Sequence, residues 1–458
     1  MSQISNLKRK LLDGTFSQSC SPEFLGKLSV ENMMARKLEL AFSQDEIDVD
    51  EDPAEYCIGG YFPVRIGQII GKNPSYRVIR KLGWGASSTV WLAKNTNDHK
   101  YYAVKIYKGD KKFVKIGKDE IDTLKYVRRN DLSAPGYNNV IVMQRSFQIS
   151  SEFGQHVCIT FEFMQLSLFD LIRKSGGIEC NGAKIIIKQV ILGLFYLHNA
   201  CKIVHTDIKS QNILITINDL SSLKYLTAYI ERCQELNKET SKSYAMRIQQ
   251  NCSSPPILGQ TQSLDTESEL SKAAKRIKYT TCSPTFIPPN IKVKIADLGN
   301  ACLEKEIYPS TLIGTVEYRA LEVIICRKCS YSADMWSAGC VAYELSTGEH
   351  LFNPRASRTT TFDQNHLELI WQLLGGIPSK VALSGFQSHH YFNELGSLKH
   401  RKIEDLVICK TELLLTHLLW DKQKTSVFAN FIESLLQPDP SQRITASAAL
   451  KHKWLKNI

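Results

Sequence analysis

The chain has 458 residues, of which 43% are hydrophobic and 22% are charged, and its formal net charge is +11. This length exceeds one compact core and predicts two lobes or two domains, and the composition excludes collagen-like and coiled-coil proteins. Lysine and arginine form no stripe with interleaved aromatic residues, so direct nucleic-acid binding is not expected despite the basic charge.

The first segment, residues 1–55, is polar, lacks a strong period and includes the acidic run 45–52. This composition predicts a flexible N-terminal arm. Residues 1–10 are polar and basic with no apolar stretch behind them, so no secretory signal is evident. We therefore expect a soluble intracellular protein in which the 13 singly scattered cysteines stay reduced.

Residues 76–164 predict a small β-rich lobe. Short runs of β-branched and aromatic residues, separated by turn residues, indicate antiparallel strands. One helix is expected at 119–128, where Ile121, Leu124 and Val127 follow helical spacing. The expected strands are 76–82, 89–94, 100–107, 140–147 and 156–163.

Helical patterns dominate from about residue 165 to residue 455 and predict a larger helical lobe. The segment 183–199 is apolar on nearly all sides and should be a buried helix. Its most apolar part, 185–197, contains Lys188 and is too short to span a bilayer, so no membrane contact is expected. Further helices are predicted at 333–347, 365–374, 427–436 and 445–450.

A long polar segment, residues 218–290, separates the predicted strands 213–217 and 292–296 and contains stretches rich in Ser, Pro, Thr and Gln. A loop of this length inside a compact domain is either functional or disordered, so we interpret it as a spacer insert. The expected fold class is α+β, with a small β-rich N-lobe, a large helical C-lobe and the insert within the C-lobe.

The first motif that carries chemistry is a glycine-rich segment, of the form G-x-G-x-x-S-x-V, between two predicted strands. Glycines there let backbone amides approach phosphate oxygens, although a glycine-rich hairpin turn explains the segment equally well. Ser88 stands where a third glycine is common. The nucleotide-binding residues expected here are Leu82, Gly83, Trp84, Gly85, Ala86, Ser87, Ser88, Thr89 and Val90.

The second motif is Ala103-Val104-Lys105 on the predicted strand 100–107, from which a lysine can project toward nucleotide phosphates. Glu120 on the following helix is spaced to pair with Lys105, and without it Lys105 would be an ordinary strand lysine. Asp119 would point about 100° away on that helix, toward solvent. The expected nucleotide-binding set is completed by Ala103, Glu162 and Met164.

The third motif is the polar run His205–Asn212. In such a loop Asp207 would accept the proton of a substrate hydroxyl, Lys209 would neutralise the transferring phosphate, and Asn212 would hold a metal ion. A lysine two residues after the aspartate is the arrangement of serine/threonine kinases. A chance polar loop remains the alternative for a motif this short.

The fourth motif is Asp297 at the end of the predicted strand 292–296, followed by Leu298 and Gly299. Mg²⁺ favours a few carboxylates together with substrate phosphates, and Asp297 with Asn212 offers such ligands. Taken alone, an aspartate that opens a turn before glycine is the simpler interpretation.

The fifth motif is Thr315–Glu322, followed by Tyr331–Gly339 and, near the end, Arg443. We expect Glu322 and Arg443 to form a buried ion pair, because each would be a costly isolated charge without the other. Unrelated surface charges are the alternative. Five such motifs in this order resemble the protein-kinase fold over about residues 76–455, without the insert.

The flanking residues resemble one family more closely, the SR-protein kinases, which phosphorylate Arg/Ser repeats of splicing factors. The resemblance is carried by Glu51–Val64, by Lys81–Leu92, by His205-Thr206-Asp207, by Ala296–Cys302 and by the position of the insert. It implies a kinase domain over 56–455 that uses ATP and Mg²⁺ on Arg/Ser-rich protein substrates. A monomer found in both cytoplasm and nucleus is expected, with the insert influencing that distribution or serving only as a spacer.

Two features bear on regulation and substrate choice. Thr206 stands where many kinases carry an arginine that grasps an activation-loop phosphate, so activity independent of phosphorylation at Thr311 or Thr315 is expected. The family's acidic substrate-docking segment corresponds here to 353–366, which has only Asp363 as an acid and adds Arg355 and Arg358. A related kinase with another substrate preference, or an inactive pseudokinase scaffold, are the alternatives.

Overall fold

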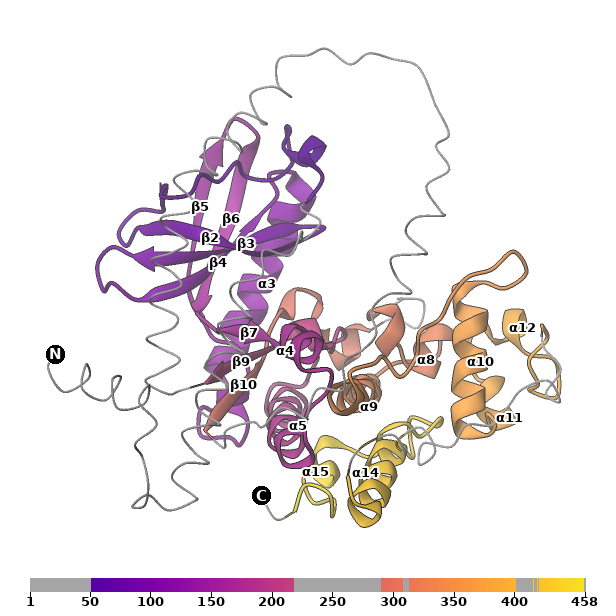
Figure 1. The fold of residues 1–458 in the computed structure, drawn as a ribbon. Helices are drawn as coiled ribbons and strands as arrows, with labels where there is room; N and C mark the ends of the chain where they lie inside the picture. The colour runs from indigo at the N-terminus through magenta and orange to yellow at the C-terminus, as the bar shows by residue number, and fades with distance from the viewer. Residues whose placement is uncertain are drawn as a thin grey trace, which may run out of the picture. The chain divides into compact units, whose positions relative to one another are not determined.

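The computed structural model describes residues 51–217, 290–307, 313–400 and 420–456, together with residues 415 and 418. These residues form the two predicted lobes (Figure 1). The predictions for most of the N-terminal arm, for the insert from 218 to 289 and for Thr311 lie outside the described residues.

The N-lobe contains an antiparallel sheet with the strand order β1-β2-β3-β4-β6-β5 (Figure 1). The two longest ladders join β2 to β3 and β5 to β6 through tight turns, in which Gly85 pairs with Ser88 and Ser151 with Gly154. The strands are β1 (Ile69–Ile70), β2 (Tyr76–Gly85), β3 (Ser88–Asn95), β4 (Tyr101–Tyr107), β5 (Met143–Ser151) and β6 (Gly154–Glu162). The sequence predicted β2 to β6 and missed the two-residue β1.

Helix α3 (Lys111–Arg129) packs on one face of this sheet. Its first turn is capped by Asp110, whose side chain accepts a hydrogen bond of 2.9 Å from the Lys112 backbone amide. The prediction 119–128 missed residues 111–118, because this charged, Lys-rich stretch carries a weaker apolar period. Tyr107 and Ile159 on the sheet pack in the same buried cluster as this helix.

The opposite face of the sheet is covered by the segment Glu51–Val64, which we call the N-terminal strap. It begins with the 3-10 helix η1 (Pro53–Glu55), and its residues Phe62 and Val64 pack with Trp91 and Ile106 of the sheet. Glu51 is buried and forms an ion pair with Lys81. The predicted arm ends at residue 55, so its last five residues already lie against the N-lobe.

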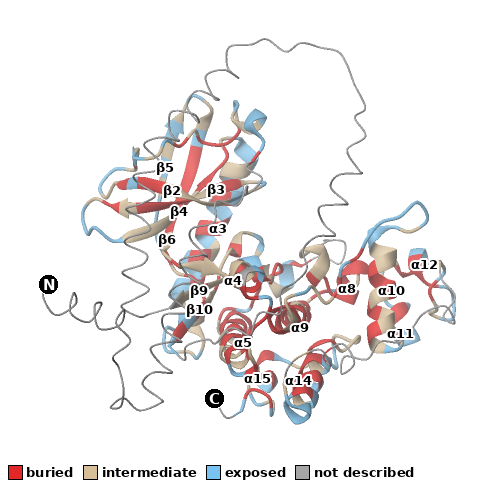
Figure 2. Cartoon of the chain, in the orientation of Figure 1, coloured by how far each residue is buried: buried red, intermediate tan, exposed pale blue. Residues whose placement is uncertain are grey.

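The C-lobe is built around two buried helices, α5 (Cys180–Phe195) and α9 (Tyr331–Thr347), which contact each other (Figure 2). Helix α5 continues into the π-helical turn η3 (Tyr196–Ala200). Around these helices lie α4 (Leu168–Ser175), α8 (Leu321–Ile324), α10 (Phe362–Leu374), α11 (Ser379–Ala382), α12 (Ser388–Tyr391), α14 (Lys422–Leu435) and α15 (Ala446–Ala449).

One helical span within the described residues, Cys180–Ala200, has the length and composition to cross a membrane. It is longer than the predicted helix 183–199 because Glu179 caps its N-terminus, accepting hydrogen bonds from the backbone amides of residues 181 and 182. Ile186, Ile187 and Val190 on it are fully buried in the C-lobe core, so its apolar character serves packing within this domain.

Two small sheets carry the loops of the site. In the first, β9 (Ile213–Ile217) pairs with β7 (Leu166–Ser167) and with β10 (Ile291–Ile295), and in the second, β8 (Ile203–Val204) pairs with β11 (Cys302–Leu303). Ile217 lies opposite Ile291 in the ladder. The strand residues that flank the insert are therefore neighbours, as expected when a segment is added between two paired strands.

Candidate active site

The structure brings three predicted residues together at Lys105 on β4. Its Nζ atom lies 3.0 Å from Oε2 and 3.1 Å from Oε1 of Glu120 on α3, and 2.9 Å from Oδ1 of Asp297 after β10. The Tyr107 hydroxyl also donates to the Glu120 carboxylate. Asp119 is exposed, as predicted. The Lys105 ammonium group therefore links helix α3 of the N-lobe to Asp297 of the C-lobe.

The charges at this point fix each other's protonation. Burial acts to lower the pKa of Lys105, but the carboxylates of Glu120 and Asp297 outweigh it and hold that pKa well above its usual value. The Lys105 ammonium in turn lowers the pKa of Asp297 to about 2 against the opposing effect of burial. Both groups are therefore charged at neutral pH, and the Asp297 side chain is 40% exposed and accessible to a ligand.

Asp297 adopts an unusual backbone conformation, with φ 63° and ψ 72°. A non-glycine residue in the left-handed region costs about 1 kcal/mol or more and persists where the surroundings fix it. On either side of Asp297, the Ala296 amide donates to the carbonyl of Asn212 at 2.8 Å, and Leu298 is fully buried beside α3. Leu298 therefore anchors the residue after Asp297 in the buried cluster.

The loop that begins at His205 and carries Asp207 is anchored by Asp334 on α9. Its carboxylate accepts the backbone amides of His205 at 2.8 Å and Thr206 at 2.9 Å, and lies 2.8 Å from Nε2 of His198. Thr206 has a φ of 72°, so this strained turn depends on the two amide contacts. Neither Asp334, which lies within the fifth motif, nor His198 was predicted to have this role.

Both carboxylate oxygens of Asp207 are engaged. Oδ1 accepts the Thr315 hydroxyl at 2.7 Å and the Thr315 amide at 3.0 Å. Oδ2 lies 2.8 Å from Nζ of Lys209 and 3.2 Å from the side-chain amide nitrogen of Asn212. Lys209 also donates to the Thr315 hydroxyl at 2.9 Å. Asp207, Lys209 and Asn212 therefore meet as predicted, with Thr315 as an additional member of the group.

The predicted metal ligands, Asn212 and Asp297, lie on loops joined by the backbone contact of Ala296 to Asn212. The side-chain amide nitrogen of Asn212 donates to Asp207 twice, to the backbone carbonyl at 2.9 Å and to Oδ2. Its amide oxygen and the ionised Asp297 are hard oxygen donors of the kind Mg²⁺ prefers. Among residues placed by the structure, no three His, Cys, Asp or Glu side chains gather into a metal cluster.

The glycine-rich segment forms the turn between β2 and β3. Among the described residues, no atom lies within 4 Å of a Cβ atom added at Gly83 or Gly85, so packing against these residues does not account for glycine there. The predicted approach of backbone amides to a phosphate is a physical reason for glycine that fits this open space. Trp84 between them is 45% exposed.

The remaining predicted nucleotide residues differ in position. Val90 lies opposite Lys105 in the β3–β4 ladder, and Ala103 stands two residues from Lys105 on the same face. Thr89 is fully buried and accepts the Trp91 indole N–H at 2.9 Å, so its side chain serves packing.

Glu162 and Met164 lie where the chain passes from β6 to β7. The Glu162 carboxylate pairs with Lys294 at 2.5 Å, and the buried Met164 sulfur accepts the Thr216 hydroxyl at 3.4 Å. Both side chains thus have partners within the protein.

The predicted buried ion pair is confirmed. Arg443 binds Glu322 with two contacts of 2.6 and 2.9 Å, and both side chains are fully buried. The guanidinium also donates to the carbonyls of Ser332 and Gln437 and lies 5.0 Å from the Trp336 ring centre. The pair connects α8, α9 and the C-terminal segment.

The segment before α8 is held by Arg319. Its guanidinium donates to the backbone carbonyls of Gly314 at 3.0 Å and Ile313 at 3.3 Å, and lies 3.5 Å from Asp363 on α10. The Thr206 hydroxyl donates to the Asn300 carbonyl at 3.0 Å. Ile313 and Gly314 are therefore held by Arg319, a contact that the sequence did not predict.

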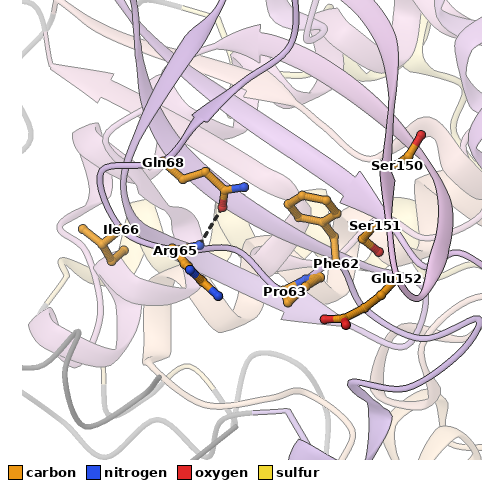
Figure 3. Close-up of a pocket in the computed structure, with 8 residues that line it drawn as sticks. All are labelled: Phe62, Pro63, Arg65, Ile66, Gln68, Ser150, Ser151 and Glu152. Atoms are coloured by element: carbon orange, nitrogen blue, oxygen red, sulfur yellow. Dashed lines mark hydrogen bonds between the residues drawn. The ribbon is translucent and has the colours of Figure 1, made fainter. Parts of the chain in front are cut away.

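A separate groove of about 550 Å³ lies on the N-lobe, between the continuation of the strap and the β5–β6 hairpin (Figure 3). It contains none of the predicted site residues. Its lining is Phe62, Pro63, Arg65, Ile66, Gln68, Ser150, Ser151 and Glu152. The chemistry assembled at Lys105 and Asp207 lies elsewhere, so the groove is not the reaction site.

Comparisons with known proteins agree with this geometry. A family model described as "Protein kinase domain" matches residues 76–229 and 285–455. The chain is 30% identical to mouse SRSF protein kinase 3 over 95% of its own length and 96% of that protein. It is 32% identical to the serine/threonine-protein kinase SRPK of Physarum polycephalum, over 89% of this chain and 92% of that one.

A solved kinase-domain structure resembles the fold, with a TM-score of 0.61 and 23% identity, over 86% of this chain and 99% of the solved chain. The interruption of the family match falls in the segment 230–284. This agrees with the predicted insert and with the neighbouring ends of β9 and β10.

Proposed function

The chain belongs to the protein kinase family and, within it, to the SRSF protein kinases, and we propose that it transfers the γ-phosphoryl group of MgATP to serine or threonine in Arg/Ser-rich proteins. The observation that carries this proposal is the pair of salt bridges that Lys105 forms with Glu120 and with Asp297. A lysine so placed can orient the phosphates of ATP, and an inactive scaffold would not need to hold all three charges together.

Each residue of the site has a task in the transfer. Asp207 accepts the proton of the substrate hydroxyl, and its contacts with Thr315 and Lys209 fix the direction in which its oxygens point. The Lys209 ammonium neutralises charge on the phosphoryl group as it moves. The glycine-rich turn between β2 and β3 supplies backbone amides to the phosphates.

Asn212 and Asp297 would hold Mg²⁺. Their donors fit the ion, because one is an amide oxygen and the other is a carboxylate that Lys105 keeps ionised. When bound, the ion would supply positive charge that offsets the negative charge of the ATP phosphates during transfer.

The decisive test is ATP turnover by the purified chain with Mg²⁺ and an Arg/Ser peptide, compared with Asp207→Asn. Loss of general-base assistance should lower kcat about 10²- to 10⁴-fold. Equal rates for the two proteins would contradict the assignment of Asp207. A wild-type protein that neither binds nor turns over ATP would favour the scaffold alternative.

We further propose that activity does not require activation-loop phosphorylation. Thr206 replaces the phosphate-grasping arginine, and Arg319 already holds the carbonyls of Ile313 and Gly314 without a phosphate. Enzyme treated with a phosphatase should keep its full rate. A preparation that is inactive until Thr311 or Thr315 is phosphorylated would overturn the proposal.

The preference for Arg/Ser substrates is expected to be weaker than a strongly acidic docking segment would give. Asp363, the single acid of 353–366, already lies beside Arg319 and accepts the Tyr391 hydroxyl at 3.3 Å, whereas Arg355 and Arg358 are exposed. An Arg/Ser peptide should still be phosphorylated faster than a peptide with acidic flanks. Equal turnover of the two would contradict Arg/Ser selection.

A further inference from the structure

The N-terminal strap contacts the glycine-rich turn directly. Tyr61 is fully buried, and its hydroxyl donates to the backbone carbonyl of Gly85 at 2.8 Å. Burial, with a further contribution from Glu55, raises the pKa of Tyr61, so the hydroxyl keeps its proton and remains a donor. The strap lies before residue 76, where the match to the kinase domain model begins.

Tyr61 is itself fixed from two sides. The Nζ atom of Lys108 lies 4.2 Å from the centre of the Tyr61 ring, and it also pairs with Glu55 at 2.9 Å. Glu51 pairs with Lys81 on β2. A Cβ atom at Gly60 would lie 1.8 Å from the Glu55 carbonyl oxygen, so the strap closes in this shape only with glycine at residue 60. The phenol ring therefore has little freedom to move.

The same segment meets the start of α3. The amides of Gly109 and Asp110 donate to the carbonyls of Gly60 at 2.9 Å and Gly59 at 2.8 Å. Asp110 is the N-cap of α3, the helix that carries Glu120. One stretch of chain thus touches two N-lobe elements of the proposed ATP site, the glycine-rich turn and the helix that pairs with Lys105.

We propose that Tyr61 is a positioning residue for the nucleotide, whose hydroxyl holds the Gly85 carbonyl and thereby sets the glycine-rich turn over the ATP phosphates. The turn is tied on its β3 side, where the Ser87 carbonyl accepts the Lys108 amide at 2.9 Å. The Tyr61 hydroxyl supplies the contact on the β2 side, at Gly85, so the two together fix where the amides of the turn point. A turn held in place before ATP binds need not be ordered by ATP, which lowers KM for ATP.

The test is Tyr61→Phe in the full chain, which removes the hydroxyl and keeps the ring. Loss of one buried hydrogen bond should raise KM for MgATP about three- to tenfold, with KM for an Arg/Ser peptide unchanged and kcat within about twofold. The matched control is Tyr102→Phe on β4, because the Tyr102 hydroxyl donates to Asp98 at 2.6 Å and not to the glycine-rich turn. This control should leave both KM values unchanged.

Direct titration of MgATP by calorimetry gives a second reading that does not need a peptide substrate. Tyr61→Phe should raise the dissociation constant for MgATP by the same factor. If Tyr61→Phe does not fold, Glu55→Gln, which loosens the Lys108 contact and leaves the hydroxyl, should give a smaller rise in KM for MgATP, about twofold.

Two outcomes would overturn the proposal. The first is unchanged MgATP binding by Tyr61→Phe, or by Glu55→Gln where Tyr61→Phe does not fold, and the second is an equal rise in KM for ATP and for peptide. The inference depends on MgATP being the nucleotide, as proposed above. A wild-type chain that does not bind MgATP would contradict that proposed function, whereas normal binding by wild type and by Tyr61→Phe alike would contradict only the role of Tyr61.

Discussion

At the scale of single residues, the site depends on a few charges whose positions are fixed by contacts from distant parts of the chain. Lys105, Asp207 and Asp297 could be predicted because phosphoryl transfer demands these side chains at recognisable local spacings. Asp334 and Tyr61 could not be predicted in the same way. Their contacts join residues 129 and 24 positions apart, and only the fold brings such partners together.

Glu120 and Asp119 form a natural matched pair, because one is buried against Lys105 and the other is exposed on the same helix. Glu120→Gln should lower kcat/KM about ten- to a hundredfold, since it removes a charge-assisted bond that orients Lys105. Asp119→Asn should change kcat/KM by less than about twofold. Steady-state kinetics decides the matter, and similar losses in both variants would exclude a specific role for Glu120.

The lowered pKa of Asp297 predicts how its contribution to stability depends on pH. A carboxyl group whose pKa is lowered in the folded state stabilises the fold above its unfolded pKa, and the effect disappears only as pH falls toward about 2. The difference in Tm between wild type and Asp297→Asn should therefore be the same at pH 8 and pH 5.5. A difference that vanishes at pH 5.5 would mean that Lys105 does not hold this pKa low.

At the scale of elements, the order and type of the main strands and helices follow from sequence periodicity, whereas their ends and the short elements do not. α3 begins at Lys111 because Asp110 caps it, although its first residues show little apolar period. The short strands β1, β7, β8 and β11 have two residues each, too few for any period to appear. The burial of Glu51 could not be predicted, because Glu51 belongs to an acidic run whose composition is typical of a solvent-exposed arm.

The ion pair of Glu322 with Arg443 joins two elements that are far apart in the sequence. Arg443→Met should lower the free energy of unfolding by about 3–5 kcal/mol, because it leaves the Glu322 carboxylate buried without its partner. The exposed pair of Lys424 with Asp421 provides the comparison. Asp421→Asn should leave the denaturation midpoint nearly unchanged, and equal effects in the two variants would contradict this ranking.

Arg319 links the segment before α8 to α10. Arg319→Met should lower kcat about tenfold, because the carbonyls of Ile313 and Gly314 lose their donors and Thr315 is no longer held firmly against Asp207. Arg358→Met, at an exposed position, is the control and should keep the wild-type kcat. Full activity in Arg319→Met would show that another contact orders this segment.

At the scale of the whole molecule, we expect the kinase domain to carry catalysis and the insert to affect only localisation or spacing. Deletion of residues 240–285 should leave kcat within about twofold and change Tm little, because loop length enters stability only logarithmically. The distribution of the protein between cytoplasm and nucleus should shift if the insert directs localisation, with the weak basic cluster 275–278 as its candidate signal. Fluorescence microscopy of both forms tests this, and an unchanged distribution would favour a simple spacer.

The pairing of Ile217 with Ile291 has a practical consequence for work in cells. Two chain ends that leave a sheet as direct neighbours can accept a folded reporter domain, provided that its own termini lie close together. A fluorescent protein placed between these strands would travel with the kinase and leave both chain termini unaltered. Asn212 and Asp297 lie at the opposite end of the β9–β10 ladder, next to the pair Ile213–Ile295, so a change in the intervening segment is kept at a distance from both.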